Sequence, residues 1–147
     1  MTDVVVFDID GTLADVSQRR RYLEGSEPDW GRFHASMETD TPNLPIVELY
    51  KALWSTARFK MILTSGRHEG ARQYTERWLV WNHIPFDTLY MRPDDDTRPD
   101  YQLKQDLLGQ ITNAHGPILF AVDDRQQVVD MWRRNGIACL QCAPGNF

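Results

Sequence analysis

The chain has 147 residues and a mass of 17.1 kDa, which fits one domain of ordinary size, about 100 to 200 residues. A hydrophobic fraction of 41% argues against disorder, and no apolar stretch approaches the roughly 18 residues that span a bilayer, so we expect no membrane contact. The net charge of -5 disfavours a long nucleic-acid footprint but is compatible with a few local contacts. The first residues show no secretory signal, which predicts a cytoplasmic protein.

Two carboxylates follow directly after the first predicted strand. Residues 4–7 form an unbroken apolar run, typical of a central parallel strand, and Asp8, Ile9, Asp10 and Gly11 come next. Residues two apart on extended backbone point the same way, so Asp8 and Asp10 are expected to face the volume where α/β sheets bind ligands. Carboxylates so close repel each other unless a cation lies between them, which favours Mg²⁺. The alternative is structural, with Asp8 capping a helix and Asp10 beginning a turn.

The segment 16–41 is interpreted as a small helical cap over this end of the sheet. Residues 14–23 contain three consecutive arginines from Arg19 and predict a loop or short helix, whereas Asp29 is placed to cap a second helix over residues 30–37. A separate domain does not fit in so few residues. A merely solvated helical connection is the alternative that the sequence leaves open.

A second strand also ends in groups that suit a phosphate. Residues 61–63 form a short apolar run, and Thr64, Ser65, Gly66 and Arg67 follow with hydroxyls, a flexible backbone and a guanidinium. The polar pattern of the first strand end is therefore repeated.

Helices are predicted on either side of this second strand. An apolar stripe after Pro45 indicates a helix, and the proline suits the first turn of that helix. The helix after Arg67 carries Tyr74, Trp78 and Trp81, and aromatic residues at this spacing are expected to bury against a sheet rather than to stack on bases.

The second half of the chain continues the alternation of strands and helices. We expect strands at residues 87–91 and 118–122 and helices at 100–110 and 128–135, the last ended by Gly136. This order predicts an α/β fold of three layers, a Rossmann-like parallel sheet with helices on both faces.

The predicted strand at residues 118–122 and the predicted helix at residues 100–110 add further charged groups. Asp123 and Asp124 follow the strand as a second carboxylate pair. Asp100 and Lys104 lie four residues apart and therefore share one face of the helix. Three strand ends thus carry polar groups.

The two cysteines, Cys139 and Cys142, are expected to be buried reduced thiols despite their C-x-x-C spacing. Residues three apart on a strand are about 10 Å apart, beyond the roughly 7 Å limit of a disulfide. The four histidines are scattered and show no metal-ligand spacing, so surface roles are expected for them.

These motifs, taken in order, resemble the haloacid dehalogenase superfamily of phosphotransferases. Residues 8–12 are similar to its first motif, Ser65 to the second, Lys104 to the third and Asp123-Asp124 to the fourth. This resemblance implies the haloacid dehalogenase-like fold, with the cap inserted after the first strand.

A narrower resemblance, to the 3′-phosphatase domain of bacteriophage polynucleotide kinase/phosphatase, covers nearly the whole chain. The residues that carry it are Arg19, Ser65-Gly66-Arg67, Thr97-Arg98, Asp100, Lys104, 122–125, 128–134 and 143–147. The kinase domain of those enzymes is marked by G-x-x-x-x-G-K-[ST], which this sequence does not contain. We therefore expect a single phosphatase domain over 1–147 and no kinase domain.

The resemblance implies the catalytic roles. Asp8 is the nucleophile that forms an aspartyl phosphate, and Asp10 first protonates the leaving oxygen and then activates water. Mg²⁺ is expected on Asp8, on the backbone carbonyl of Asp10 and on Asp124, with Asp123 bound either directly or through a water.

The resemblance also implies a phosphate site. Ser65, beside Gly66, and Lys104 are expected to hold phosphoryl oxygens, and Asp100 matches a position that orients the lysine. Arg67 and Arg19 match phosphate-binding arginines, although membership of an exposed basic run is an equal alternative for Arg19. Arg98 and Arg125 are further candidates for this role, with pairing to neighbouring aspartates as the alternative.

The function implied is a magnesium-dependent polynucleotide 3′-phosphatase that acts on DNA or RNA ends, including 2′,3′-cyclic phosphates. Its partners would be a single-stranded or terminal 3′ end and a separate kinase or ligase. The alternatives are a phosphatase for mononucleotides or small metabolites, and a non-catalytic module that binds nucleic-acid ends.

Overall fold

A five-stranded sheet forms the centre of the computed structural model, which describes residues 2–147. The strands are β1 (Asp3–Asp8), β4 (Phe59–His68), β5 (Thr88–Arg92), β6 (Ile118–Asp123) and β7 (Ala138–Gln141), in the order β5-β4-β1-β6-β7. All four pairings are parallel. Val4 to Phe7 are buried on both faces of β1, as their unbroken apolar run predicts.

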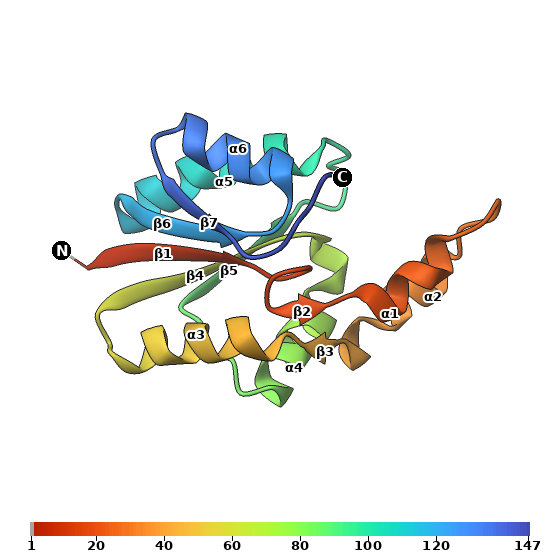
Figure 1. Ribbon diagram of the computed structural model, residues 1–147. Helices are drawn as coiled ribbons and strands as arrows, with labels where there is room; N and C mark the ends of the chain where they lie inside the picture. The colour runs from red at the N-terminus through yellow and green to blue at the C-terminus, as the bar shows by residue number, and fades with distance from the viewer. Residues whose placement is uncertain (1) are drawn as a thin grey trace.

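Helices cover both faces of the sheet, so the predicted three-layer α/β fold is confirmed (Figure 1). On one face, α3 (Leu44–Ser55) and α4 (Arg72–Trp81) pack with Phe7 and Leu63 around a buried cluster that includes Trp78. On the other, α5 (Asp100–His115) and α6 (Gln126–Arg134) pack with Val6 around a cluster that includes Trp132. Alternate residues of β1 thus serve opposite faces, as the geometry of a strand requires.

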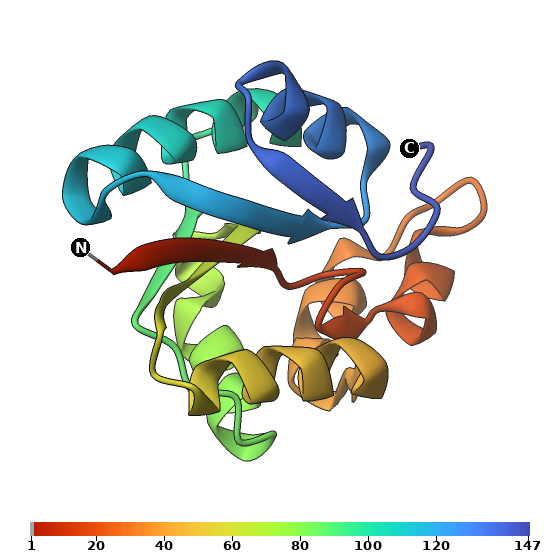
Figure 2. The same cartoon turned by 60° about the vertical axis from the view of Figure 1, so that its left-hand side comes forward.

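The segment 16–41 lies beyond the carboxyl ends of the strands (Figures 1 and 2). It begins and ends at a short antiparallel pair, β2 (Ala14–Asp15) and β3 (Thr41–Pro42). Between these strands come α1 (Ser17–Arg20), the 3-10 turn Arg21–Leu23, α2 (Trp30–Ala35) and the 3-10 turn Met37–Thr39. A third 3-10 turn, Glu69–Ala71, leads into α4. The Asp29 side chain accepts a hydrogen bond from the Arg32 amide and caps α2 as predicted.

The strand order places a topological switch point at β1. The chain adds β4 and β5 on one side of β1 and then crosses to β6 and β7 on the other. In open α/β sheets, ligands bind outside the carboxyl ends of the strands at such a point. The ends of β1, β4 and β6 therefore define the region where a site is expected.

Several elements differ in length from their predictions. The β4 strand continues to His68 through its polar residues, and α5 continues to His115, where Gly116 ends it with a φ of 103°. Among the described residues, no helix is long and apolar enough to cross a membrane. Cys139 and Cys142 are free thiols, and burial raises their pKa values to about 12 and about 11, which agrees with the reduced state predicted for them. Cys139 is buried as expected, whereas Cys142 is only half-buried, so the predicted burial is wrong for Cys142.

The prediction for the aromatic residues of α4 is correct only for Trp78. Trp78 is buried and donates from Nε1 to the Asp40 carbonyl oxygen at 2.8 Å. Tyr74 is 40% exposed and Trp81 83% exposed. Helical spacing places the three rings on one side of the helix, but the protein covers only the middle one, and the expectation that Tyr74 and Trp81 pack against the sheet is wrong.

Replacing the two tryptophans separately tests this difference in packing. Trp78→Ala is expected to lower the free energy of unfolding by about 3–5 kcal/mol, because it empties a buried site and removes a hydrogen bond. Trp81→Ala, three residues further on the same helix, should change it by no more than about 0.5 kcal/mol. Urea unfolding of both variants measures the two values, and equal losses would contradict the described packing.

Candidate active site

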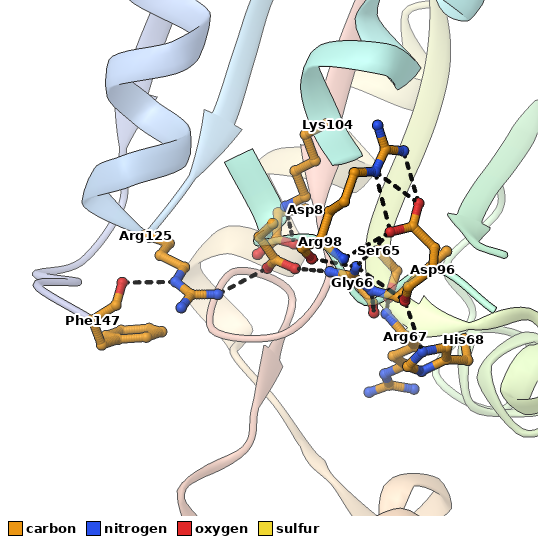
Figure 3. A network of polar contacts seen from close by, with 12 residues as sticks. Asp8, Ser65, Gly66, Arg67, His68, Asp96, Arg98, Lys104, Arg125 and Phe147 are labelled. Carbon is orange, nitrogen blue, oxygen red and sulfur yellow. Dashed lines mark hydrogen bonds and ion pairs between the residues drawn. The ribbon is translucent and has the colours of Figure 1, made fainter. Parts of the chain in front are cut away.

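Polar side chains from the ends of β1, β4 and β6 meet at the switch point. The cavity there has a volume of about 520 Å³, within the range of about 300–1,000 Å³ usual for small-molecule sites. Its lining includes Asp8, Asp10, Arg67 and Asp124 from the sheet side, and Figure 3 shows part of this polar network. The segment 16–41 lines the cavity with the following residues: Val16, Arg19, Arg20, Leu23, Trp30, Phe33, His34 and Met37.

Lys104 of α5 joins the carboxylates of two strands. Its side chain is almost completely buried, and Nζ lies 2.8 Å from Asp8 Oδ1 and 2.8 Å from Asp123 Oδ2. Thr12 Oγ1 donates to the other oxygen of Asp8 at 3.0 Å. Both oxygens of the predicted nucleophile are therefore held in place before any substrate binds.

The pKa of Asp8 lies well above its ordinary value. Burial is the main cause, followed by the negative charges of Asp123 and Asp124, against which Lys104 acts. For Lys104, burial by itself lowers the pKa, but Asp123 and Asp8 raise it well above the ordinary value. The ammonium is thus charged, while the carboxylates around it need a further positive charge to stay ionised together.

Asp8, Asp123 and Asp124 form an acidic cluster that fits a hard divalent cation. One carboxylate oxygen from each lies within 4.8 Å of the others. Oxygen ligands of this kind are those that Mg²⁺ prefers. Burial and the charge of Asp123 raise the pKa of Asp124, so a cation would also relieve repulsion there.

Within this cluster, Asp124 is better placed than Asp123 to contact a cation. Asp123 already accepts from Lys104 through Oδ2 and from the Asp124 amide through Oδ1 at 2.9 Å. The Asp124 carboxylate lies against Gly11, where a Cβ atom would come within 2.1 Å of Oδ2. Gly11 also has a φ of 85°, a backbone conformation that favours glycine. A side chain at this position would therefore strain the backbone and collide with the Asp124 carboxylate.

Two buried arginines converge on Asp10. Arg67 Nε lies 3.0 Å from Asp10 Oδ2, and Arg19 Nη2 lies 3.1 Å from Oδ1. Behind them, Asp40 accepts from Arg19 at 2.7 Å and from Arg67 at 3.2 Å. Arg19 is only 1% exposed, so the alternative of an exposed basic run is wrong for this residue.

One nitrogen of this arginine pair has no partner. Arg19 Nη1 is buried and makes no hydrogen bond within residues 2–147, although Arg19 lines the cavity. A buried guanidinium N–H without an acceptor destabilises the folded protein, because the group has lost its hydrogen bonds to water and gained none in return. An acceptor that came within reach of this nitrogen would satisfy it.

The same arginines set the protonation of Asp10. Burial alone would raise the pKa of Asp10, but the charge and hydrogen bonds of Arg67, and then the charge of Arg19, lower it below the ordinary value. Asp10 is therefore a carboxylate while both guanidinium groups hold it.

The remaining predicted phosphate residues lie around the end of β4. Ser65 is fully buried, and its Oγ accepts from the Arg67 amide at 3.0 Å, whereas Gly66 and Arg67 line the cavity. A Cβ atom on Gly66 would come within 2.5 Å of Asp100 Oδ1, so the glycine admits the Asp100 carboxylate. Contact between Ser65 and a phosphate stays a prediction.

Asp100 reaches two arginines rather than the lysine. It accepts from Arg92 Nη2 at 2.6 Å and lies 3.2 Å from Arg125 Nη1. No hydrogen bond joins Asp100 to Lys104 within residues 2–147, and Asp100 affects the pKa of Lys104 through its charge. The expectation that Asp100 orients the lysine therefore does not rest on direct contact. Arg125 pairs with Asp100, and Arg98 pairs with Asp96 and Asp106, which is the alternative that the sequence left open for both arginines.

Sequence reasoning missed two buried residues of this region. Asp40, at the end of the segment 16–41, has no periodic or motif signal in the sequence. Arg92 ends β5 and donates to the Gly66 carbonyl oxygen at 2.9 Å as well as to Asp100. The strand-end pattern that identified Asp8 and Arg67 also applies to Arg92, so that residue had a detectable signal.

Comparison with known proteins assigns the family. The family model described as the polynucleotide kinase PNKP phosphatase domain matches residues 2–147. The chain belongs to the PNKP phosphatase-domain family. The predicted resemblance to the haloacid dehalogenase superfamily and to a polynucleotide kinase phosphatase is thereby confirmed.

Relatives of this PNKP phosphatase domain are longer proteins. A putative bifunctional polynucleotide kinase/RNA ligase of Autographa californica nuclear polyhedrosis virus is 30% identical over 130 residues, which are 88% of this chain and 17% of that protein. A chain in the solved Pnkp1/Rnl/Hen1 RNA repair complex is 33% identical with a TM-score of 0.85, and the match covers 100% of this chain and 44% of the other.

A more distant structure shares the fold of the PNKP phosphatase domain. The haloacid dehalogenase-like family protein SP0104 of Streptococcus pneumoniae is 17% identical with a TM-score of 0.69, and the match covers 95% of this chain and 84% of that one. The likeness extends the fold assignment to the wider superfamily.

The close approach of Gly11 to the Asp124 carboxylate gives a test of the cation site. Mg²⁺ at about 100 times its Kd is expected to add about 2.7 kcal/mol to the free energy of unfolding of the wild-type protein. Gly11→Ala should remove this gain, because the methyl group displaces the Asp124 carboxylate. Thermal unfolding with Mg²⁺ or with EDTA measures the difference.

Gly109→Ala is the matched control, since nothing lies within 4 Å of a Cβ atom at this helical position. It should keep the full response to Mg²⁺. If Gly11→Ala fails to fold, Asp124→Asn provides the same test without backbone strain. A wild-type response in Asp124→Asn would contradict the assignment of the cation site.

Proposed function

We propose that this chain is a magnesium-dependent polynucleotide 3′-phosphatase that removes the terminal 3′-phosphate, or a 2′,3′-cyclic phosphate, from DNA or RNA. The observation that carries the proposal is the pairing of Asp8 with Asp10 beside two buried arginines, in a chain of the PNKP phosphatase-domain family. This set provides a nucleophile, a proton donor and an anion site within one cavity.

The reaction has two displacements at phosphorus. Asp8 attacks the phosphorus atom, the bond to the sugar O3′ breaks, and Asp10 gives its proton to that oxygen. Water then attacks the aspartyl phosphate, Asp10 takes a proton from it, and inorganic phosphate leaves with Asp8 restored. Lys104 and Thr12 fix the Asp8 carboxylate throughout, since they hold its two oxygens.

Substrate phosphate and Asp10 compete for the same guanidinium groups. A phosphate that engages Arg19 and Arg67 withdraws part of their charge and hydrogen bonding from Asp10, and these are the interactions that lower its pKa. Binding therefore favours the protonated acid that the first step needs. Asp40 still pairs with both arginines and keeps them in place.

Mg²⁺ would be held by Asp8, Asp124 and the Asp10 backbone carbonyl, with Asp123 behind them. When bound, it offsets the negative charge shared by the nucleophile and the phosphate. The acidic cluster supports this assignment because it holds three carboxylates and one ammonium, which contacts only Asp8 and Asp123.

The partners proposed are a nucleic-acid 3′ end and a separate kinase or ligase. A 3′-phosphatase leaves a hydroxyl, the group that a ligase joins to a 5′ end. The matched relatives, described as a polynucleotide kinase/RNA ligase and as an RNA repair complex, support this placement. The chain spans less than half the length of either relative.

The second candidate is a phosphatase for mononucleotides. It is favoured by the net charge of -5 and by the modest cavity of about 520 Å³. A panel of a 3′-phosphorylated oligonucleotide, a 3′-mononucleotide and a 5′-mononucleotide separates the two. Rapid phosphate release from the oligonucleotide is expected, and release only from the mononucleotides would end the polynucleotide proposal.

Substitution of the two aspartates tests the chemistry. Asp8→Asn is expected to abolish turnover because the amide cannot form the aspartyl phosphate. Asp10→Asn should lower kcat by about 10²–10⁴-fold, the usual contribution of general acid–base catalysis. The measurement is phosphate release in Mg²⁺, with circular dichroism as the check on folding.

Asp95→Asn, at an exposed aspartate away from the cavity, is the matched control and should keep wild-type turnover. EDTA should stop the wild-type enzyme, and added Mg²⁺ should restore it. Normal turnover in a folded Asp8→Asn protein would refute the proposed mechanism.

A further inference from the structure

The α2 helix of the segment 16–41 presents a cluster of aromatic rings to the cavity. Trp30, Phe33 and His34 all line it, and we call these three residues the aromatic wall. The centroids of Trp30 and Phe33 lie 5.7 Å apart, and Trp30 stacks on His34 at 6.1 Å. Trp30 is nevertheless 56% exposed, so a large part of the residue is accessible beside the active site.

The aromatic wall is continuous with the proposed phosphate site. The Arg19 guanidinium carbon lies 4.6 Å from the centre of the Phe33 ring, and Arg19 also contacts Asp10. A molecule whose phosphate meets Arg19 therefore has the aromatic wall next to it. The wall extends from the anion site toward solvent through Phe33 and then Trp30.

Positive charge lies elsewhere on the cavity lining. Arg20 and Arg125 line the cavity with Phe147, and their guanidinium carbons lie 5.3 Å and 5.1 Å from the Phe147 ring centre. Arg125 Nε also donates to the Phe147 carbonyl oxygen at 2.7 Å, as Figure 3 shows. Aromatic faces beside guanidinium groups are the combination that binds single-stranded nucleic acid, since bases stack while phosphates pair with the charges.

We propose that the aromatic wall, chiefly Trp30, stacks on the unpaired base of the 3′-terminal nucleotide, while Arg20 and Arg125 contact the phosphate before it. This inference rests on the proposed 3′-phosphatase activity and adds how the enzyme recognises a polynucleotide end. Charge complementarity supports this occupant at Arg20, which forms no ion pair within residues 2–147, whereas the other basic side chains of the lining, Arg125 included, pair with aspartates. A base that remains paired cannot insert its face, so single-stranded ends are preferred.

The test compares Trp30→Ala with Trp81→Ala on two substrates. Trp81 is a second exposed tryptophan that does not line this cavity, which makes it the matched control. One substrate is a single-stranded oligonucleotide with a 3′-phosphate, and the other is the same oligonucleotide with an abasic 3′-terminal residue. Phosphate release gives kcat and KM for each pair.

Trp30→Ala is expected to raise KM for the intact oligonucleotide by about 5-fold to 150-fold, the range of one stacked base, with kcat little changed. The abasic oligonucleotide should have the same KM with wild type and with Trp30→Ala. Trp30→Phe should recover most of the affinity, and Trp81→Ala should behave as wild type on both substrates.

Two other outcomes are possible, and they contradict different proposals. If Trp30→Ala matches wild type on the intact oligonucleotide, or loses equally on both substrates, base stacking on Trp30 is refuted while the 3′-phosphatase activity stands. If the wild-type protein releases no phosphate from the oligonucleotide but hydrolyses mononucleotides, the proposed function fails and this inference fails with it.

Discussion

The buried ammonium of Lys104 is the constraint on which the site depends. Burying an ion costs several kcal/mol in lost hydration, and the two contacts of 2.8 Å to Asp8 and Asp123 offset that cost. The same contacts join α5 to the ends of β1 and β6, so the fold and the nucleophile are fixed by one group. Asp124 adds a third carboxylate to the cluster. The excess negative charge matches a divalent cation in sign and amount.

A second layer of charge connects this centre to the segment 16–41. Asp40 pairs with Arg19 and Arg67, and its carbonyl oxygen accepts from Trp78 in the core. Arg19 is therefore fixed through Nε, which leaves Nη1 without a partner. Such preorganisation lowers the entropy lost when a phosphate binds. Asp10 shares the arginines but is itself one-third exposed in its side chain, so it can exchange them for an incoming anion.

The parallel sheet and most of the site could be predicted from the sequence, because parallel strands bring their carboxyl ends together, whereas the order of the strands in the sheet was not predicted. Asp8, Arg67 and Asp124 follow strands, and helical spacing placed Lys104 beside Asp100 on α5. Asp40 could not be found, since its burial depends on partners 21 and 27 residues away and no period marks it. Trp81 shows that helical spacing does not predict burial. Spacing says which residues share a side of a helix, but only the tertiary structure says how far that side is covered.

The acidic composition is compatible with the proposed nucleic-acid substrate, because the carboxylates of the site face basic side chains in two separate groups. The carboxylates of Asp10 and Asp40 face two arginines and are compensated locally, whereas those of Asp8 and Asp123 share Lys104 and the divalent cation proposed beside it. Screening in physiological salt limits exposed charges to about 8 Å, which keeps distant surface aspartates from dominating the cavity. The field that the proposed substrate would meet is then set by groups on the cavity lining. Net charge therefore disfavours a long duplex footprint without opposing recognition of a single terminus.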